Sequence, residues 1–241
     1  MIRIAAVGDI HYTTESRGAL RPHLESLEEQ ADVLVIAGDL TARGDPAEAE
    51  VLAEDLRVAA VPIVAVLGNH DYHLDGQSEI RRGLEAAGVL LLEGDAHLLE
   101  IDGARLGIAG VKGFGGGFAG ACATEFGEPE FKAFVRHTRE VADRLAEALA
   151  SLEADSRLAL LHYAPVEATL RGERPEIYPF LGSYLLGEAV DAAGADLVLH
   201  GHAHRGIEKG VTPGGVHVRN VAQPVIKHAY NLYCLSGENG P

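Results

Sequence analysis

Five short apolar runs in this chain each end at an aspartate, an asparagine or a histidine. The runs cover residues 2–7, 33–37, 63–67, 158–161 and 197–199. Each run is short and almost wholly apolar, which is typical of a strand that is buried on both faces of a sheet. The carboxyl ends of parallel strands meet at one edge of a sheet, where such sheets bind ligands. We therefore expect the polar residues behind these runs to lie together.

Segments with the apolar spacing of helices separate these runs. The sequence predicts helices within 16–30, from 46 to about 57, over 78–87, from 129 to about 152 and over 183–193. Alternating strands and helices are typical of a parallel sheet with helical crossovers. Other strands are expected at 89–92, 216–221 and 232–235, and Asp102-Gly103 predicts an antiparallel hairpin between 98–101 and 105–109.

Three further segments carry expectations of their own. The apolar residues of the helix at 129–152, which begin with Phe131 and Phe134, are expected to pack in the core. Residues 113–120 are too rich in glycine for regular structure, and their two phenylalanines either contact a ligand or anchor a loop. The polar residues 167–179 are expected to form a loop that follows the fourth apolar run.

Composition and charge exclude several classes of partner. The chain of 241 residues carries 20 Lys and Arg against 36 Asp and Glu, a net charge of −16, which repels nucleic-acid backbones and anionic lipid. No cluster of basic residues overrides this charge, and no apolar run is long enough for a membrane span. We therefore expect neither a nucleic-acid polymer nor a membrane as a partner.

Cysteine content and the N-terminal sequence predict the compartment. Cys122 and Cys234 are too few for a disulfide framework, so two free thiols in a reducing compartment are expected. The N-terminus enters the first apolar run directly, without the pattern of a signal peptide. With no linker visible, we expect a single cytoplasmic domain over residues 1–241.

The tetrapeptide at positions 68–71 places three chemically active side chains in consecutive positions. Asn69 can offer a neutral oxygen to a cation, and His70 can donate or accept a proton near neutral pH. Asp71 can fix the orientation of the imidazole, and Gly68 allows a sharp turn of the backbone. The same four residues would also suit an ordinary polar turn.

The polar residues behind the five runs form a set that suits metal binding. Seven of them offer oxygen or nitrogen ligands: Asp9, His11, Asp39, Asn69, His162, His202 and His204. Taken singly, Asp9 and Asp39 could cap helices and His162 could be a core histidine. His202 and His204 would project from one face of an extended segment. His200 would share that face, but it is assigned to structure or to the support of the ligands because the site is already complete. Together, the seven suffice for two divalent cations with positions left for water and substrate.

The combination of these motifs resembles the calcineurin-like metallophosphoesterase superfamily. The matching motifs are Asp9-x-His11, Gly38-Asp39, Gly68-Asn69-His70-Asp71, His162 and Gly201-His202-x-His204, which span nearly the whole chain. The resemblance implies an α/β fold, a four-layer αββα sandwich of two mixed β-sheets flanked by helices. It also implies one metal on Asp9, His11, Asp39 and His204, and another on Asp39, Asn69, His162 and His202, with Asp39 bridging.

The resemblance also implies a mechanism. Two divalent ions outweigh the charge of the two carboxylates, so the site would attract a phosphate oxyanion although the whole protein is acidic. A metal-bound hydroxide would act as the in-line nucleophile. The catalytic residues would be His70 and Asp71. The imidazole of His70 would protonate the leaving oxygen or stabilise its developing charge, and Asp71 would orient that imidazole. Mixed Asp, Asn and His ligands accept Mn, Fe, Zn, Ni or Co, among which Mn or Fe is favoured.

Departures from better-known branches narrow the expected substrate. Ala42 stands where purple acid phosphatases have tyrosine and the classical serine/threonine protein phosphatases have aspartate, and Asp71 stands in place of their glutamate. The resemblance is therefore to a bacterial branch of small phosphodiesterases. Small phosphodiesters, with cyclic nucleotides among them, are the expected substrates. A phosphomonoesterase for small molecules and a catalytically silent interaction scaffold are the alternatives.

Overall fold

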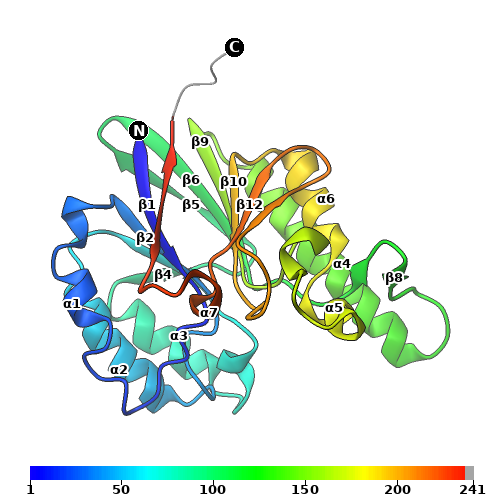
Figure 1. Ribbon diagram of the computed structural model, residues 1–241, viewed down its shortest axis with the longest axis horizontal. Coiled ribbons are helices and arrows are strands. Elements are labelled where there is room, and N and C mark those ends of the chain that lie inside the picture. The colour runs from blue at the N-terminus through cyan, green and yellow to red at the C-terminus, as the bar shows by residue number, and fades with distance from the viewer. Residues whose placement is uncertain (237–241) are drawn as a thin grey trace.

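Two mixed β-sheets pack face to face in the computed structural model, which describes residues 1–236 (Figure 1). The first sheet contains, in order, β13 (Asn231–Leu235), β1 (Ile2–Val7), β2 (Val33–Ala37), β3 (Ile63–Val66) and β4 (Val89–Leu91). The second contains β11 (Lys209–Val211), β12 (His217–Asn220), β10 (Leu197–His200), β9 (Ser156–Leu161), β6 (Ala104–Val111) and β5 (Asp95–Ile101).

The central strands of each sheet are parallel, and their carboxyl ends lie level with one another. In the first sheet β1, β2, β3 and β4 run parallel, with Val7 opposite Ile36 and Ala37 opposite Val66. In the second sheet β12, β10, β9 and β6 run parallel. Strands β13, β11 and β5 pair antiparallel at the sheet margins. The five predicted apolar runs are thus confirmed as strands that end at two adjacent sheet edges.

Helices cover the outer faces of both sheets. The first sheet packs on α2 (Pro46–Leu56) and α3 (Gln77–Glu85), and the second on α4 (Pro129–Ala150) and α6 (Tyr184–Ala193). Alternate residues of β1 divide between the layers, since Ile4 and Ala6 face the second sheet whereas Ala5 and Val7 face the helices. The predicted four-layer αββα arrangement is therefore confirmed.

Shorter elements connect these layers. They are α1 (Arg21–Leu24), α5 (Tyr178–Leu181), α7 (Gln223–Ile226) and the 3₁₀ turns η1 (Leu27–Glu29), η2 (His70–Tyr72), η3 (Glu167–Leu170) and η4 (Pro175–Ile177). The prediction of one helix within 16–30 is wrong in extent, because Ser26 leaves helical geometry at φ −132° and splits the segment into α1 and η1. The leucines on either side still reach the core.

The hairpin prediction is confirmed. Strands β5 and β6 are antiparallel neighbours, and Asp102 and Gly103 both have positive φ, at 49° and 82°. Such dihedrals match the twist of a two-residue hairpin turn, and glycine adopts them without steric cost. The hairpin adds β5 to the edge of the second sheet, where β6 also pairs in parallel with β9.

Three expectations for less regular segments need correction. Residues 113–120 are not wholly irregular, because β7 (Gly117–Phe118) pairs with β8 (Ala121–Cys122). The segment 167–179 is not a simple polar loop, since η3 buries Leu170. Phe131 is 56 % exposed and Phe134 is half-buried, so core packing by α4 begins only at Val135.

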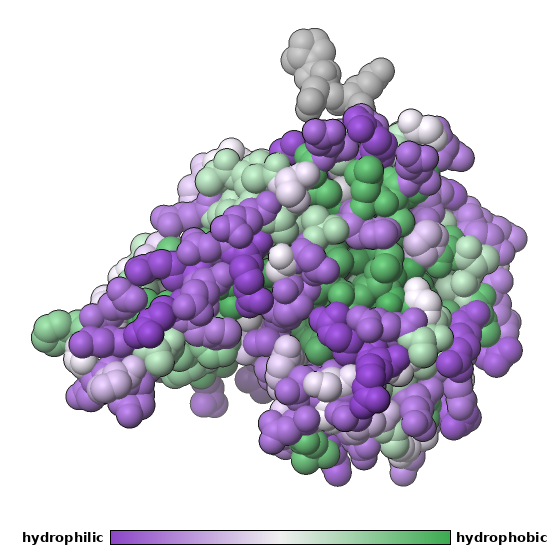
Figure 2. All heavy atoms as spheres, turned by 180° about the vertical axis from the view of Figure 1, so that it is seen from behind, coloured by the Kyte–Doolittle hydropathy of each residue, from purple (hydrophilic) through white to green (hydrophobic). Residues whose placement is uncertain are grey.

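The surface is mostly hydrophilic, in keeping with the high charge of the chain. Figure 2 shows the face that is hidden in Figure 1, where hydrophobic side chains gather in one area surrounded by hydrophilic ones. Among residues 1–236, every helix is too short or too polar to cross a membrane.

Candidate metal centre

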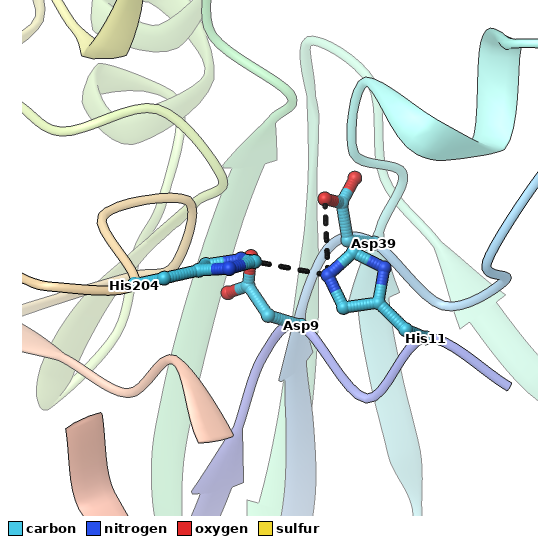
Figure 3. A group of neighbouring side chains, drawn as sticks. All are labelled: Asp9, His11, Asp39 and His204. Carbon is cyan, nitrogen blue, oxygen red and sulfur yellow. Dashed lines mark hydrogen bonds and ion pairs between the residues drawn. The ribbon is translucent and has the colours of Figure 1, made fainter. Parts of the chain in front are cut away.

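The predicted ligands come together where the two sheet edges meet. Asp9 and His11 follow β1, Asp39 follows β2, and His204 lies in the loop after β10. One ligand atom from each of these four residues lies within 4.8 Å of the others, and Figure 3 shows the side chains converging. A second group of the same kind contains Asp39, His162 and His202. Asp39 therefore belongs to both groups.

Asn69 completes the second group. Its Oδ1 lies 2.9 Å from His162 Nε2, which in turn lies 3.3 Å from Asp39 Oδ1. All seven candidate ligands are thus brought into one place, in the two sets that the resemblance implies. The first sheet contributes four of them and the second sheet three.

The donor set fits two divalent cations. In the first group, His204 Nε2 lies 2.8 Å from Asp9 Oδ1, and His11 Nε2 lies 3.4 Å from His204 Nε2 and 3.7 Å from Asp39 Oδ2. Within residues 1–236, no Lys or Arg nitrogen comes within 4.0 Å of either buried carboxylate, whose ion-pair partners are all histidines. Buried carboxylates need a counter-charge, and mixed imidazole and oxygen ligands suit a divalent transition metal.

Burial tunes the protonation of three candidate histidine ligands in favour of metal binding. Burial lowers the pKa of His11 to about 4 and that of His202 to about 3, and it holds the pKa of His162 well below its usual value. These imidazoles are therefore neutral at pH 7 and keep a lone pair for a metal. Burial also raises the pKa of Asp9 to about 6, against the hydrogen bond from His204.

Four of the candidate ligands have left-handed backbone conformations. The φ angles are 56° at Asp9, 43° at His11, 51° at Asp39 and 68° at His202. This region costs a residue with a side chain roughly 1–2 kcal/mol, although Asp and His occupy it more readily than most. Strain that collects at successive strand ends is typical of a functional site.

The positive φ of His202 also overturns one expectation. The segment after β10 is a tight turn in which Ala203 N donates to Gly201 O at 2.8 Å, so it is not extended. His202 and His204 therefore do not share one face, and they enter different ligand groups. His200 is the last residue of β10, one residue beyond the predicted run, and it is fully buried with Nε2 2.9 Å from the Thr169 hydroxyl.

Two glycines leave space for the buried carboxylates. A Cβ at Gly68 would overlap the side chain of Asp39, and one at Gly201 would overlap that of Asp9. Gly68 does not use the left-handed freedom of glycine, because its φ is not positive. The reason for glycine at this position is the close approach of the Asp39 carboxylate.

His70 lies beside the shared carboxylate, but Asp71 does not orient it. The backbone N–H of His70 donates to Asp39 Oδ1 at 2.8 Å, and its ring Nδ1 donates to the Ala42 carbonyl at 2.7 Å. That bond leaves Nε2, 4.0 Å from Asp39 Oδ2, free to face a ligand. The His70 side chain is 44 % exposed, so the ring stands at the open edge of the site.

Asp71 instead connects the loops after β2 and β3 through hydrogen bonds. Its fully buried carboxylate accepts hydrogen bonds from Gly68 N, Leu40 N, Thr41 N and the Thr41 hydroxyl, at 2.6–3.2 Å. Burial raises its pKa to about 6, against these hydrogen bonds. The expected contact between Asp71 and the His70 imidazole is wrong, because all of its hydrogen bonds go to the loops after β2 and β3.

Sequence reasoning missed the aromatic residues around the second group. The ring of Tyr163 lies 4.3 Å from that of His202, between centroids, and 5.6 Å from that of His162. Tyr72 ends the 3₁₀ turn that His70 begins. The only sequence signal was position, since each tyrosine stands within two residues of a candidate site residue.

Comparisons with known proteins agree with this geometry. The family model described as calcineurin-like phosphoesterase matches residues 2–206. The phosphopantetheinyl hydrolase of Mycobacterium tuberculosis has a similar structure, with a TM-score of 0.67 and 16 % identity over 91 % of this chain and 88 % of that one. A putative 5′-nucleotidase from Staphylococcus aureus is also similar, with a TM-score of 0.56 and 16 % identity over 91 % of this chain and 48 % of that one.

At these identities the solved structures show a shared fold. A search of curated proteins gave no significant match. The family model covers most of the chain, and both ligand groups are assembled in the fold. The chain therefore belongs to the calcineurin-like phosphoesterase family, as a metal-dependent phosphoesterase.

Proposed function

We propose that this protein is a two-metal phosphodiesterase for small phosphodiesters, with cyclic nucleotides among the candidate substrates. The observation that carries the proposal is the position of Asp39, whose carboxylate belongs to both ligand groups. One residue shared between two groups would set two cations side by side, where together they can stabilise the attacking and the leaving oxygen of an in-line displacement at phosphorus.

In this proposal the residues at the strand ends hold the two ions. Asp9, His11, Asp39 and His204 would hold one of them, and Asp39, Asn69, His162 and His202 the other, with Mn or Fe favoured. Divalent ions bound there would lower the pKa of a coordinated water and would neutralise charge on the reacting phosphate. The neutral imidazoles described above need lose no proton before they bind a metal, which supports this assignment.

His70 is the proposed general acid. The Ala42 carbonyl holds Nδ1–H and fixes the rotation of the ring, so Nε2 is directed to the space above Asp39. A proton on Nε2 would pass to the leaving-group oxygen as its bond to phosphorus breaks. Asp71 acts only indirectly, by holding the loops that carry His70 and Asp39.

The open edge of the site supports a diester as the substrate. The side chains of His70 and His204 are 44 % and 40 % exposed, so this edge is open to solvent. A diester carries a substituent on each side of phosphorus and needs space for both. The small side chain of Ala42 adds no ligand or obstacle beside His70.

The partners and the compartment proposed for the enzyme follow from its net charge and its cysteines. The net charge of −16 argues against a nucleic-acid polymer or an anionic membrane as a partner. Cys122 and Cys234 are exposed free thiols, which supports a reducing compartment such as the cytoplasm.

The test compares a diester with a monoester under control of the metal. Turnover of bis-p-nitrophenyl phosphate and of p-nitrophenyl phosphate is measured on metal-stripped protein and after addition of Mn, and then of Fe, Zn, Ni or Co in separate aliquots. Faster diester cleavage that requires metal is the expected result. Faster monoester cleavage would replace the proposal with a phosphomonoesterase, and no turnover with Mn, Fe, Zn, Ni or Co would favour the interaction scaffold.

A further inference from the structure

Lys112 lies directly after β6, and its ammonium group stands among three aromatic rings. Lys112 Nζ is 5.1 Å from the ring centroid of Tyr72, and 5.2 Å from the centroids of both Phe114 and Tyr163. Each of these distances is within the range of a cation–π interaction. We call these three rings and Lys112 the lysine cage.

The cage holds the ammonium without neutralising it. Among residues 1–236, no carboxylate oxygen lies within 4.0 Å of Lys112 Nζ. Its one hydrogen bond goes to the Gly113 carbonyl at 3.3 Å, although an ammonium has three N–H donors. The nearby Glu93 is engaged elsewhere, since its carboxylate accepts from Lys112 N at 3.3 Å and pairs with Arg144 at 3.7 Å.

The cage shares a wall with the second ligand group. Tyr163 belongs to both, because its ring lies 5.2 Å from Lys112 Nζ and 4.3 Å from the centroid of the His202 ring. The Lys112 carbonyl also accepts from the backbone N–H groups of His162 and Tyr163, both at 3.0 Å. Burial lowers the pKa of Lys112, and the charges of Glu93 and Asp39 act against that shift.

From this geometry we propose that the lysine cage binds a second phosphate of the substrate, so that Lys112 is a specificity-determining residue. The preferred substrates are then phosphoesters that carry another phosphate group, either adjacent to the reacting phosphorus or separated from it by one nucleoside sugar. A compact ammonium with free donors binds a phosphate as a point charge, and the rings around it exclude water. This inference rests on the proposed function.

The test uses esters that differ by one phosphate. The parent ester is thymidine 5′-(p-nitrophenyl phosphate). It is compared with its 3′-phosphorylated form and with the p-nitrophenyl ester of thymidine 5′-diphosphate. Wild-type protein should cleave at least one phosphorylated ester with a kcat/KM at least tenfold above that of the parent, mainly through a lower KM.

Substitutions at position 112 then test whether the charge of the Lys112 side chain causes the preference for the second phosphate. Lys112→Met should remove the preference for the second phosphate, because methionine carries no charge to bind it. Lys112→Arg should retain part of the preference. Lys132→Met, on the exposed first turn of α4, is the matched control and should leave the preference unchanged.

Calorimetry gives a second readout that does not depend on turnover. Wild-type protein should bind thymidine 3′,5′-bisphosphate or thymidine 5′-diphosphate at least tenfold more tightly than thymidine 5′-monophosphate, and Lys112→Met should abolish the difference. The inference would be overturned if wild type bound and cleaved the compounds with and without the second phosphate equally well. It would also be overturned if Lys112→Met kept the preference for the second phosphate. Failure of the proposed function would look different, since metal-loaded wild type would not cleave the parent ester at all.

Discussion

His70 is the residue at which metal binding and turnover can be separated. Its ring is fixed by the Ala42 carbonyl, and it belongs to neither ligand group. His70→Ala should retain both metals and lower kcat for the diester by roughly 10²–10⁴-fold, the usual contribution of a general acid. Metal content by mass spectrometry and steady-state kinetics check both parts.

The control for His70 is its neighbour His73. This residue is exposed and follows the same 3₁₀ turn, so His73→Ala removes an imidazole from the same segment. It should leave kcat within about twofold, because a surface substitution removes no contact with the site. Full activity in His70→Ala would contradict the role proposed for its ring.

Asp71 should matter for stability more than for chemistry. Its carboxylate accepts four hydrogen bonds, three of them from the backbone N–H groups of Gly68, Leu40 and Thr41. Asp71→Asn replaces one acceptor oxygen with an N–H₂ group that faces these donors. The free energy of unfolding should fall by about 2–4 kcal/mol, as for buried polar groups left unsatisfied.

Urea denaturation of metal-free protein measures this loss. Asp75→Asn is the matched control, since Asp75 is exposed and its φ of 57° suits asparagine equally well. A loss for Asp71→Asn no larger than that of the control would show that the four hydrogen bonds do not hold the loops.

At the residue scale, the ligand set could be predicted and the supporting contacts could not. Asp9 and Asp39 are recognisable because each follows a buried strand after a glycine. The bonds from Asp71 to the loop at Leu40 depend on two loops meeting in space, which no local pattern records. The role of Asp71 in sequence reasoning was therefore wrong, although its position was right.

At the scale of elements, the strand ends can bring the candidate ligands together only because they approach one another closely. Gly201 lies where the end of β10 faces Asp9. Gly201→Ala would place a Cβ against the Asp9 carboxylate, so the variant should lose at least one metal and most of its activity while it still folds. Metal stoichiometry, circular dichroism and diester turnover check these three outcomes.

Gly83 provides the control for this substitution. It lies within α3 with no atom near the position of an added Cβ. Gly83→Ala should retain both metals and stabilise the protein by about 0.5–1 kcal/mol, through the higher helix propensity of alanine. A Gly201→Ala variant with full metal content would refute the close approach of β10 to Asp9.

The ion pair between β1 and the start of β2 predicts a dependence of stability on pH. Burial alone would raise the pKa of Asp32, but hydrogen bonds from Arg3 outweigh it and lower the pKa. A lowered pKa stabilises the fold above the unfolded value of about 4, and this contribution is lost as pH falls through the folded value.

The variant Asp32→Asn removes this contribution. Its melting temperature should lie below that of wild type at pH 7, and the difference should shrink as the pH falls below about 4. Asp143→Asn, on the exposed face of α4, should show no such pH-dependent difference. A gap between Asp32→Asn and wild type that stays constant from pH 7 to pH 3 would disprove the linkage.

Elements whose stabilising contacts are local could be predicted from sequence. The helix α6 begins at Ser183, whose hydroxyl accepts from Leu185 N, and it ends at Gly194 with φ 81°, both of which are sequence signals. The short β11 and α7 were not predicted, since β11 depends on pairing with β12. Such short elements form through tertiary contacts and have little sequence pattern of their own.

At the scale of the whole molecule, the site lies across the junction of the two sheets. Asp9, His11, Asp39 and Asn69 come from the first sheet, and His162, His202 and His204 come from the second. Two cations would therefore hold the two halves of the sandwich together as well as supply the chemistry. That residues 1–241 form one domain stays a prediction, which this shared site supports.

The topology of the two sheets was only partly readable from the sequence. The alternation of strands and helices gave the parallel cores, because each crossover has a helical pattern. The return of β13 to pair antiparallel with β1 joins the two ends of the described chain, and such long-range pairing leaves no local signal. Resemblance to a family, rather than periodicity, supplied the second sheet.

Anomalous diffraction from crystals of the Mn-loaded protein, measured at the Mn absorption edge, tests the central claim most directly. The account predicts two peaks per chain. One should lie among Asp9, His11, Asp39 and His204, and the other among Asp39, Asn69, His162 and His202, with Asp39 touching both. A single peak, or peaks away from these residues, would contradict a two-metal centre.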